Sequence, residues 1–461
     1  MLSIEVITLH SNIYEKHSVN KLILTFSLPA IASLLVETLT IVLDTSFAGH
    51  LGEDSEYALA ALGLLSPVMT FFLALQTLFA MSTAIMISTQ MGNDNPFRIN
   101  NYFQTGVLMT LLISIGASVF TWIGMDEILV SLHASGAIYT QAKQYLSFIL
   151  LSNVFSSIGY TMTSVIRAFG YPKMEMLLIS FSVVVNIVAN AILTFGMSLG
   201  IQGIALGTLI SEFVCALIAI VFLLRKNLMF RIKKISVIDT LKMVYEMAKI
   251  GLAQTLIQLL GGISALVINE QLMQTGSSGY VATWNIANKI YMLMIMPIVG
   301  ITQAVQTIIS YFNGKGEESK KNLTVKRTIL ICFIYGVFST MIVLFGGKYM
   351  LYLFTTDKEI FGKVMAIIKV IFLTFPLLGI TYTIMTLLQV TGKELRAVSL
   401  GVIRQVITII PLVIMLPYLF SAWEIGGIDA AFSIFFAVPV ADLLTLFVAI
   451  FFIVSKKRLS S

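Results

Sequence analysis

The chain has 461 residues, of which 57% are hydrophobic and only 11% are charged, and its mean hydropathy is +0.93. Soluble domains carry roughly a quarter charged residues, so a soluble fold could not bury this much apolar surface. The net charge of +6 could suggest nucleic acid, but most basic residues lie in short loops between apolar segments, so we expect no nucleic-acid binding.

Apolar runs of about twenty residues with few charges predict membrane-spanning helices. The first apolar run is followed by GHLGEDSE and not by a small-residue cleavage site, so we expect it to stay as the first membrane helix. The predicted helices, in chain order, are 22–46, 58–90, 102–123, 144–166, 176–196, 200–224, 248–273, 280–311, 328–346, 364–390, 398–419 and 430–454.

The distribution of basic residues predicts the orientation of these helices. If both termini are cytoplasmic, 22 of the 29 Lys and Arg residues fall in the terminal segments and the even-numbered loops. Five others lie in or beside the outer loops, and Lys289 and Arg404 lie within helices. Cytoplasmic loops of membrane proteins carry an excess of Lys and Arg. We therefore expect a multi-pass protein of the cell membrane with both termini in the cytoplasm.

Two pairs of matching segments show an internal repeat. STQMGNDN resembles ISYFNGKG, and RAFGYPKM resembles QVTGKELR, which aligns Gly92 with Gly314 and Gly170 with Gly392 at one offset of 222 residues. Each half then has six helices in the same orientation, related by a pseudo-twofold axis along the membrane normal. The expected fold is all-α, with twelve transmembrane helices in two pseudo-symmetric six-helix bundles. The expected domains are 1–224, a basic cytoplasmic linker at 225–247, and 248–461.

Several kinds of chemistry are absent from the sequence. Cys215 and Cys332 each lie in an apolar run without a CxxC partner, and the four histidines are isolated, so we expect no metal site. The P-loop pattern of ATPases is also missing. We therefore expect a protein that is not an enzyme, uses no cofactor and takes its energy from an ion gradient. Two bundles of this kind suit alternating access better than a channel.

Ionisable residues inside membrane helices are costly and are functional candidates by default. Glu37 and Asp44 both lie in the first predicted helix. Seven residues is nearly two helical turns, so both carboxylates are expected on one face, about 10 Å apart along the axis. Such a carboxylate can bind and release a proton, and an approaching cation favours release. The alternative is a structural acid that fixes helix packing.

Other polar residues within the helices are further candidates. Asn153, Asn186 and Asn190 are expected in the bundle interior, where amides either orient a carboxylate or join helices. For Lys289 and Arg404 we expect long side chains that reach the membrane interface. Weaker candidates are Glu212, Glu270 and Asp442.

The pattern resembles the multidrug and toxic compound extrusion (MATE) family of cation-coupled antiporters. The resemblance rests on an Asp followed by a GHLG turn and an AALG segment, then on STQMGNDN, VIRAFGYPKM, VVNIVANAILTFG and GIQGIALGTLIS in the expected order. It covers essentially the whole chain, and the overall pattern is similar to bacterial multidrug exporters of the Gram-positive type.

This resemblance implies that Asp44 is the coupling acid for protons or sodium ions, with Asn186 and Thr208 as polar residues grouped around it. The chain has Asn190 where many relatives have an Asp, and its tenth helix contains Tyr382 and Gln389 but no carboxylate. We expect a monomer that exports small organic cations and other xenobiotics across the lipid bilayer, with antibiotic resistance as a consequence.

Three alternatives come from other classes of protein. A lipid-linked saccharide flippase of the same superfamily would need a larger cationic cavity, whereas only Lys289 and Arg404 lie within the predicted helices. An intramembrane enzyme would need a catalytic constellation, and a channel would need a pore-loop motif. The sequence contains neither feature, so export is the favoured interpretation.

Overall fold

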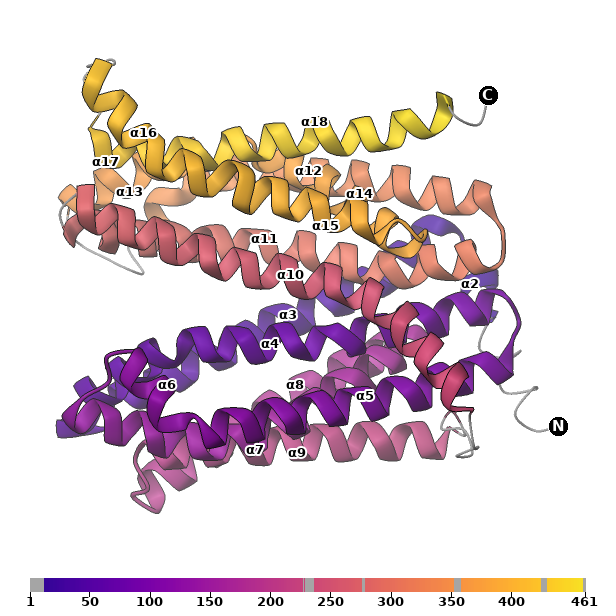
Figure 1. Cartoon of the computed structure of the whole chain (residues 1–461), viewed down its shortest axis with the longest axis horizontal. Helices are drawn as coiled ribbons and strands as arrows, with labels where there is room; N and C mark the ends of the chain where they lie inside the picture. Colours follow the sequence, from indigo (N-terminus) through magenta and orange to yellow (C-terminus); the bar gives the residue numbers. More distant parts are fainter. Residues whose placement is uncertain are drawn as a thin grey trace. The chain divides into compact units, whose positions relative to one another are not determined.

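The computed structural model describes residues 12–226, 228, 236–275, 278–351, 358–423 and 429–458. Every regular element within these residues is a helix (Figure 1). Eleven of the described helices are long and apolar enough to cross a bilayer, and the bent pair α13 and α14 forms the twelfth span. The protein is thus an all-α polytopic membrane protein with twelve transmembrane helices in two pseudo-symmetric six-helix bundles, as the sequence predicted.

The helices of the first half are α2 (Asn12–Lys16), α3 (Val19–Gly49), η1 (Gly52–Asp54), α4 (Ser55–Gly92), α5 (Pro96–Ile123), α6 (Met125–Ser131), α7 (Gly136–Ala168), α8 (Pro172–Ala191), the π-helical η2 (Ile192–Gly196) and α9 (Ile201–Arg225). Those of the second half are α10 (Val237–Thr275), α11 (Ser278–Gly314), α12 (Glu318–Leu351), α13 (Lys358–Ile371), α14 (Phe375–Val390), α15 (Glu394–Val402), the π-helical η3 (Ile403–Ile409), α16 (Ile410–Trp423), α17 (Ala430–Ser433), η5 (Ile434–Phe436) and α18 (Ala437–Arg458).

The tenth predicted helix differs from the expected single segment 364–390. It is divided into α13 and α14, which are bent by 47° across a short break. The cause is Pro376 in the first turn of α14. Proline lacks the N–H that would continue the helix, and its ring clashes with the carbonyl of the residue four positions earlier. The break places Thr374 at the N-cap of α14.

The seventh helix begins earlier than expected. Because α10 starts at Val237, the last part of the predicted 225–247 linker is helical. Residues 227 and 229–235 of that linker lie outside the described residues. Two apolar side chains of this early part are buried, since Met243 and Met247 pack with Leu78 and Phe79 of α4. The extension of α10 is therefore tied to the first half of the chain.

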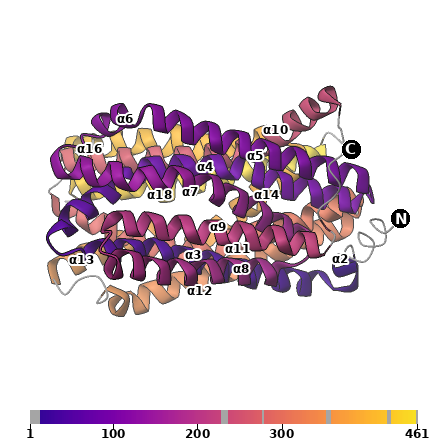
Figure 2. The same ribbon diagram turned by 90° about the horizontal axis from the view of Figure 1, so that it is seen from below.

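The chain forms two compact units by packing. Unit 1 comprises Met1–Thr255 and Gln306–Lys321, and unit 2 comprises Leu256–Val305 and Asn322–Ser461. In unit 1, α7 packs against α4, α5 and α9, and α8 packs against α3 and α9 (Figures 1 and 2). The division of the sequence at the 225–247 linker stays a prediction about the repeat.

The glycines that defined the repeat have matching roles in the two halves. Gly170 and Gly392 both have positive φ angles, of 89° and 73°, in the turns after α7 and α14. Gly92 and Gly314 lie at the ends of α4 and α11. A Cβ on Gly92 would lie 2.1 Å from the carbonyl oxygen of Tyr311, and a Cβ on Gly314 would lie 2.0 Å from the carbonyl oxygen of Thr89. Only glycine permits this close approach of backbones.

Candidate functional site

The candidate site in unit 1 depends on the close packing of α8 and η2 against α9. Gly203 and Gly207 are one turn apart on α9. A Cβ on Gly203 would lie 2.6 Å from the Thr194 backbone nitrogen, and one on Gly207 would lie 1.9 Å from Asn190 Oδ1. Small residues spaced four apart let membrane helices approach closely. The GIALG segment therefore allows the polar face of α8 to lie against α9.

Four predicted site residues form one chain of hydrogen bonds across three helices. Asn190 Nδ2 donates to Asp44 Oδ1 at 2.7 Å and to Asn186 Oδ1 at 3.1 Å. Asn186 Nδ2 in turn donates to Thr208 Oγ1 at 3.3 Å, and that hydroxyl donates to the Ile204 carbonyl oxygen at 3.1 Å. The amide of Asn190 therefore fixes the position of the Asp44 carboxylate from α8.

The two amides of this hydrogen-bonded chain are buried. Asn186 and Asn190 are 1% and 0% exposed, and Asp44 is half-buried. Asn190 Oδ1 is buried and has no hydrogen-bond partner among the described residues. Buried polar atoms are normally bonded. A carboxylate beside an unpartnered amide oxygen offers oxygen ligands of the kind that hard cations prefer.

The other two predicted residues do not join this chain. Glu37 is exposed on α3. Asn153 is buried in a separate amide cluster, where it accepts from Gln76 Nε2 at 3.3 Å and donates to Ser118 Oγ at 3.1 Å. Asn153 thus joins α7 to α4 and α5, in the manner of a packing amide.

Comparisons with known proteins decide the family. A family model described as MatE matches residues 29–192 and 250–415, which is more than half of the chain. The chain belongs to the MATE family. The similarity extends to the Multidrug export protein MepA of Staphylococcus haemolyticus, with 29% identity over 94% of each chain. MepA of Staphylococcus aureus (strain MRSA252) is 28% identical over 88% of this chain and 89% of its own length.

A solved structure agrees on the fold. The outward-facing conformation of a multidrug resistance MATE family transporter of the MOP superfamily has a TM-score of 0.86 to this chain. The two sequences are 20% identical, and the match covers all of this chain and 98% of the other chain. At this identity the likeness concerns the fold alone.

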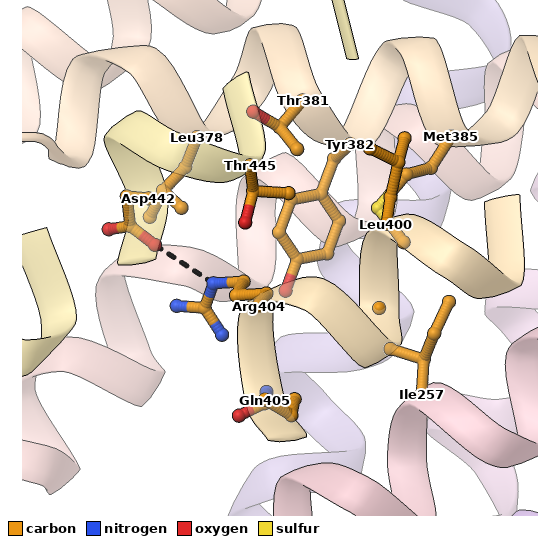
Figure 3. A pocket seen from close by; sticks show the side chains of 11 residues that line it. Ile257, Leu378, Thr381, Tyr382, Met385, Leu400, Arg404, Gln405, Asp442 and Thr445 are labelled. Atoms are coloured by element: carbon orange, nitrogen blue, oxygen red, sulfur yellow. Dashed lines mark hydrogen bonds and ion pairs between the residues drawn. The ribbon is translucent and has the colours of Figure 1, made fainter. Parts of the chain in front are cut away.

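Unit 2 of this MATE protein contains a charged pair that the sequence interpretation missed. We expected Arg404 to reach the membrane interface, and this prediction was wrong. Arg404 Nε donates to Asp442 Oδ1 at 2.8 Å, and their side chains are 16% and 1% exposed. The tenth predicted helix contains no carboxylate, and the carboxylate that pairs with Arg404 belongs to Asp442 of α18 (Figure 3). Of the other candidates, Lys289 is exposed on α11, and Glu270 accepts a hydrogen bond from Gln274 at 2.8 Å.

A second buried pair lies in unit 1. Arg167 is the penultimate residue of α7, and its Nη1 is 2.6 Å from Glu175 Oε1 on α8. Both side chains are buried, at 5% and 4% exposure. The two residues flank the turn at Gly170, so their spacing of eight was a signal that could have been found.

Proposed function

We propose that this MATE protein is a secondary antiporter that exports organic cations in exchange for protons or sodium ions. The observation that carries the proposal is the Asp44 carboxylate, held by Asn190 at 2.7 Å inside a membrane-spanning bundle. A charged group in such a place is expensive and is usually kept for function. The names of the staphylococcal relatives, which are multidrug export proteins, support organic compounds as cargo.

The proposed mechanism is competition for one carboxylate. A proton or a sodium ion neutralises Asp44, and the cargo cation takes its place when the ion leaves. The charge of Asp44 is compensated both when the proton or sodium ion is bound and when the cargo is bound. Neither state therefore leaves an unpaired carboxylate in the bilayer. No resident cofactor is required, since the ion gradient supplies the free energy.

Inverted membrane vesicles test this proposal directly. Uptake of several fluorescent organic cations would be followed under a proton gradient alone and under a sodium gradient alone. We expect accumulation against the dye gradient that survives ATP depletion and collapses with an ionophore for the coupling ion. Uptake that needs ATP and ignores both gradients would contradict the proposal. The comparison of the two gradients identifies the ion.

The orientation proposed from the basic residues places both termini in the cytoplasm. Single cysteines at Ser11 and Ser460, which lie outside the described residues, would be introduced after removal of Cys215 and Cys332. Both new cysteines should resist an impermeant thiol reagent in intact cells and react after permeabilisation. Labelling of either one in intact cells would reverse the proposed topology.

A further inference from the structure

The short helix α2 lies at the end of unit 1 where the chain begins (Figure 1). It has only five residues, Asn12–Lys16. Isolated helices of fewer than about 12 residues are marginal in water, so α2 depends on contacts with the rest of the protein. Of the described side chains of α2, that of Tyr14 is the buried one, at 0% exposure. The position of α2 is therefore set mainly by this tyrosine.

Tyr14 contacts four long helices of unit 1. Its ring stacks on that of Tyr311 of α11, with the centroids 4.3 Å and the planes 12° apart, and lies 5.4 Å from the ring of Phe26 of α3. Its hydroxyl donates to the carbonyl oxygen of Ala168, the last residue of α7, at 2.8 Å. Ser88 of α4 is a close neighbour of this hydroxyl and is 0% exposed. Docked α2 thus covers the ends of these helices.

An ion pair adds a second contact between α2 and the end of α11. Lys315 Nζ donates to Glu15 Oε1, and the Tyr311 hydroxyl donates to the same oxygen at 3.0 Å. These two donors hold the pKa of the Glu15 carboxyl below its usual value. The side chains of Glu15 and Lys315 are 45% and 32% exposed, and exposed ion pairs contribute little to stability. The attachment of α2 therefore rests on one buried ring and one weak ion pair.

The partner helix α11 belongs to both compact units. Its residues up to Val305 lie in unit 2, and its last residues, from Gln306, lie in unit 1. This last part packs closely on α4, because Gly92 has no Cβ to meet the carbonyl oxygen of Tyr311. Alternating access requires one helical bundle to move against the other. A helix that belongs to both units has to change its contacts with one of them during that movement.

We propose that α2 is a latch, which when docked holds the end of α11 against α4 and α7 and which detaches when this end of the protein opens during export. The inference rests on the proposed antiport function, in which the carboxylate of Asp44 is exposed first to one side of the membrane and then to the other. A helix that only stabilised the fold would stay docked throughout the transport cycle. The two roles therefore differ in whether export requires α2 to move.

The reactivity of a position covered by α2 reports its detachment. Ser88→Cys would be introduced into a full-length chain whose two natural cysteines have been replaced, and its rate of reaction with N-ethylmaleimide would be measured in vesicles. Tyr14→Ala should raise this rate about tenfold or more, because the buried ring that holds α2 is lost. Tyr14→Phe, which keeps the stacked ring, should raise it less. Glu15→Lys should raise it about two- to fivefold, and Lys315→Glu in the same chain should reverse this increase.

A reversible cross-link tests whether export requires detachment. A bifunctional thiol reagent that forms reducible disulfides would join Glu15→Cys to Lys315→Cys, and export of an organic cation would be measured before and after reduction. We expect the cross-link to stop export and reduction to restore it. The matched control joins Asp126→Cys to Lys143→Cys, because this exposed ion pair of 2.6 Å also connects two helices of unit 1, α6 and α7. The control cross-link should leave export unchanged.

Two results would overturn the inference. One is unchanged export after the cross-link between positions 15 and 315, because α2 would then stay docked throughout the cycle. The other is an unchanged reaction rate of Ser88→Cys in Tyr14→Ala, with the melting temperature showing that the variant is folded. The outcome is separable from the proposed function. Equal export by the cross-linked and unlinked proteins would leave antiport standing without the latch. If the unlinked protein exports no organic cation under either ion gradient, antiport fails, and the reaction rate of Ser88→Cys still tests the docking of α2.

Discussion

The close approach of α9 to Asn190 makes Gly207→Ala the most informative single substitution in unit 1. The added Cβ would lie 1.9 Å from Asn190 Oδ1 and 2.9 Å from the Asn190 backbone nitrogen. The amide must therefore move, and it is the group that holds Asp44. Overpacking costs about 1–3 kcal/mol, and the loss of a hydrogen bond to a charged group costs about 1.5–3 kcal/mol. The gain in helix propensity returns only about 0.5–1 kcal/mol, which leaves a net destabilisation of about 2–5 kcal/mol.

The measurement is the melting temperature of detergent-solubilised protein, together with export of an organic cation in vesicles. Gly116→Ala is the matched control, because it lies within α5 and a Cβ there would meet nothing within 4 Å. We expect Gly207→Ala to lower both the melting temperature and export, and Gly116→Ala to lower neither. Gly207→Ala combined with Asn190→Ala should recover part of the stability, since the contact with Oδ1 is gone and only the contact with the backbone nitrogen stays, but it should not recover export.

Normal stability and normal export in Gly207→Ala would refute this reasoning, because the Asn190 amide could not then be packed as described. Recovery of export in the combined variant would refute the functional part alone. It would mean that Asp44 works without the hydrogen bond from Asn190, and that this amide has a packing role only.

Three further predictions concern ionisable residues of unit 1. Asp44→Asn should reach the membrane at near-normal levels, because an amide oxygen can still accept a hydrogen bond from Asn190, but this variant should lose gradient-driven export. Normal export would mean that the coupling site lies elsewhere, with Glu37 as the next candidate. Glu37→Gln, which removes a charge outside the hydrogen-bond chain, should reduce export less than Asp44→Asn in the same vesicles. Arg167→Gln should lower protein accumulation strongly, since an unpaired buried Glu175 costs about 3–5 kcal/mol. Adding Glu175→Gln to the same chain should restore much of that accumulation. Unchanged accumulation in Arg167→Gln would show that the pair is not buried.

The helices and the repeat could be predicted because they depend on local signals. A bilayer requires long apolar runs, so eleven of the twelve expected segments coincide with a membrane-spanning helix of the structure, and the tenth covers the bent pair α13 and α14. Gly170 and Gly392 were aligned from the sequence alone, and both occupy left-handed turns. The grouping of Asn186 and Thr208 near Asp44 came from the family resemblance and agrees with the observed hydrogen bonds.

The pairing of charges between helices could not be predicted in the same way. Whether Arg404 reaches the interface or meets Asp442 depends on the rotation of η3, and a π-helical stretch changes that rotation without a clear sequence signal. Helical spacing places Glu37 and Asp44 on one face, but spacing within α3 says nothing of the partners on other helices. Asp44 meets Asn190 of α8, and that partner could not be inferred from the spacing.

The two units differ in charge at helices that correspond by the repeat. The offset of 222 residues aligns Arg404 with Ser182 of α8, and Ser182 donates a neutral hydrogen bond to the Ser211 carbonyl oxygen at 3.0 Å. The charge of the candidate site in unit 1 comes from Asp44 of α3, which has no cationic partner among its described contacts. In unit 2 the charges of Arg404 and Asp442 cancel. A change in the protonation of Asp44 therefore alters the net charge of its site, whereas the pair in unit 2 starts from neutrality. This difference in charge supports our proposal that the ion couples at the acid of unit 1.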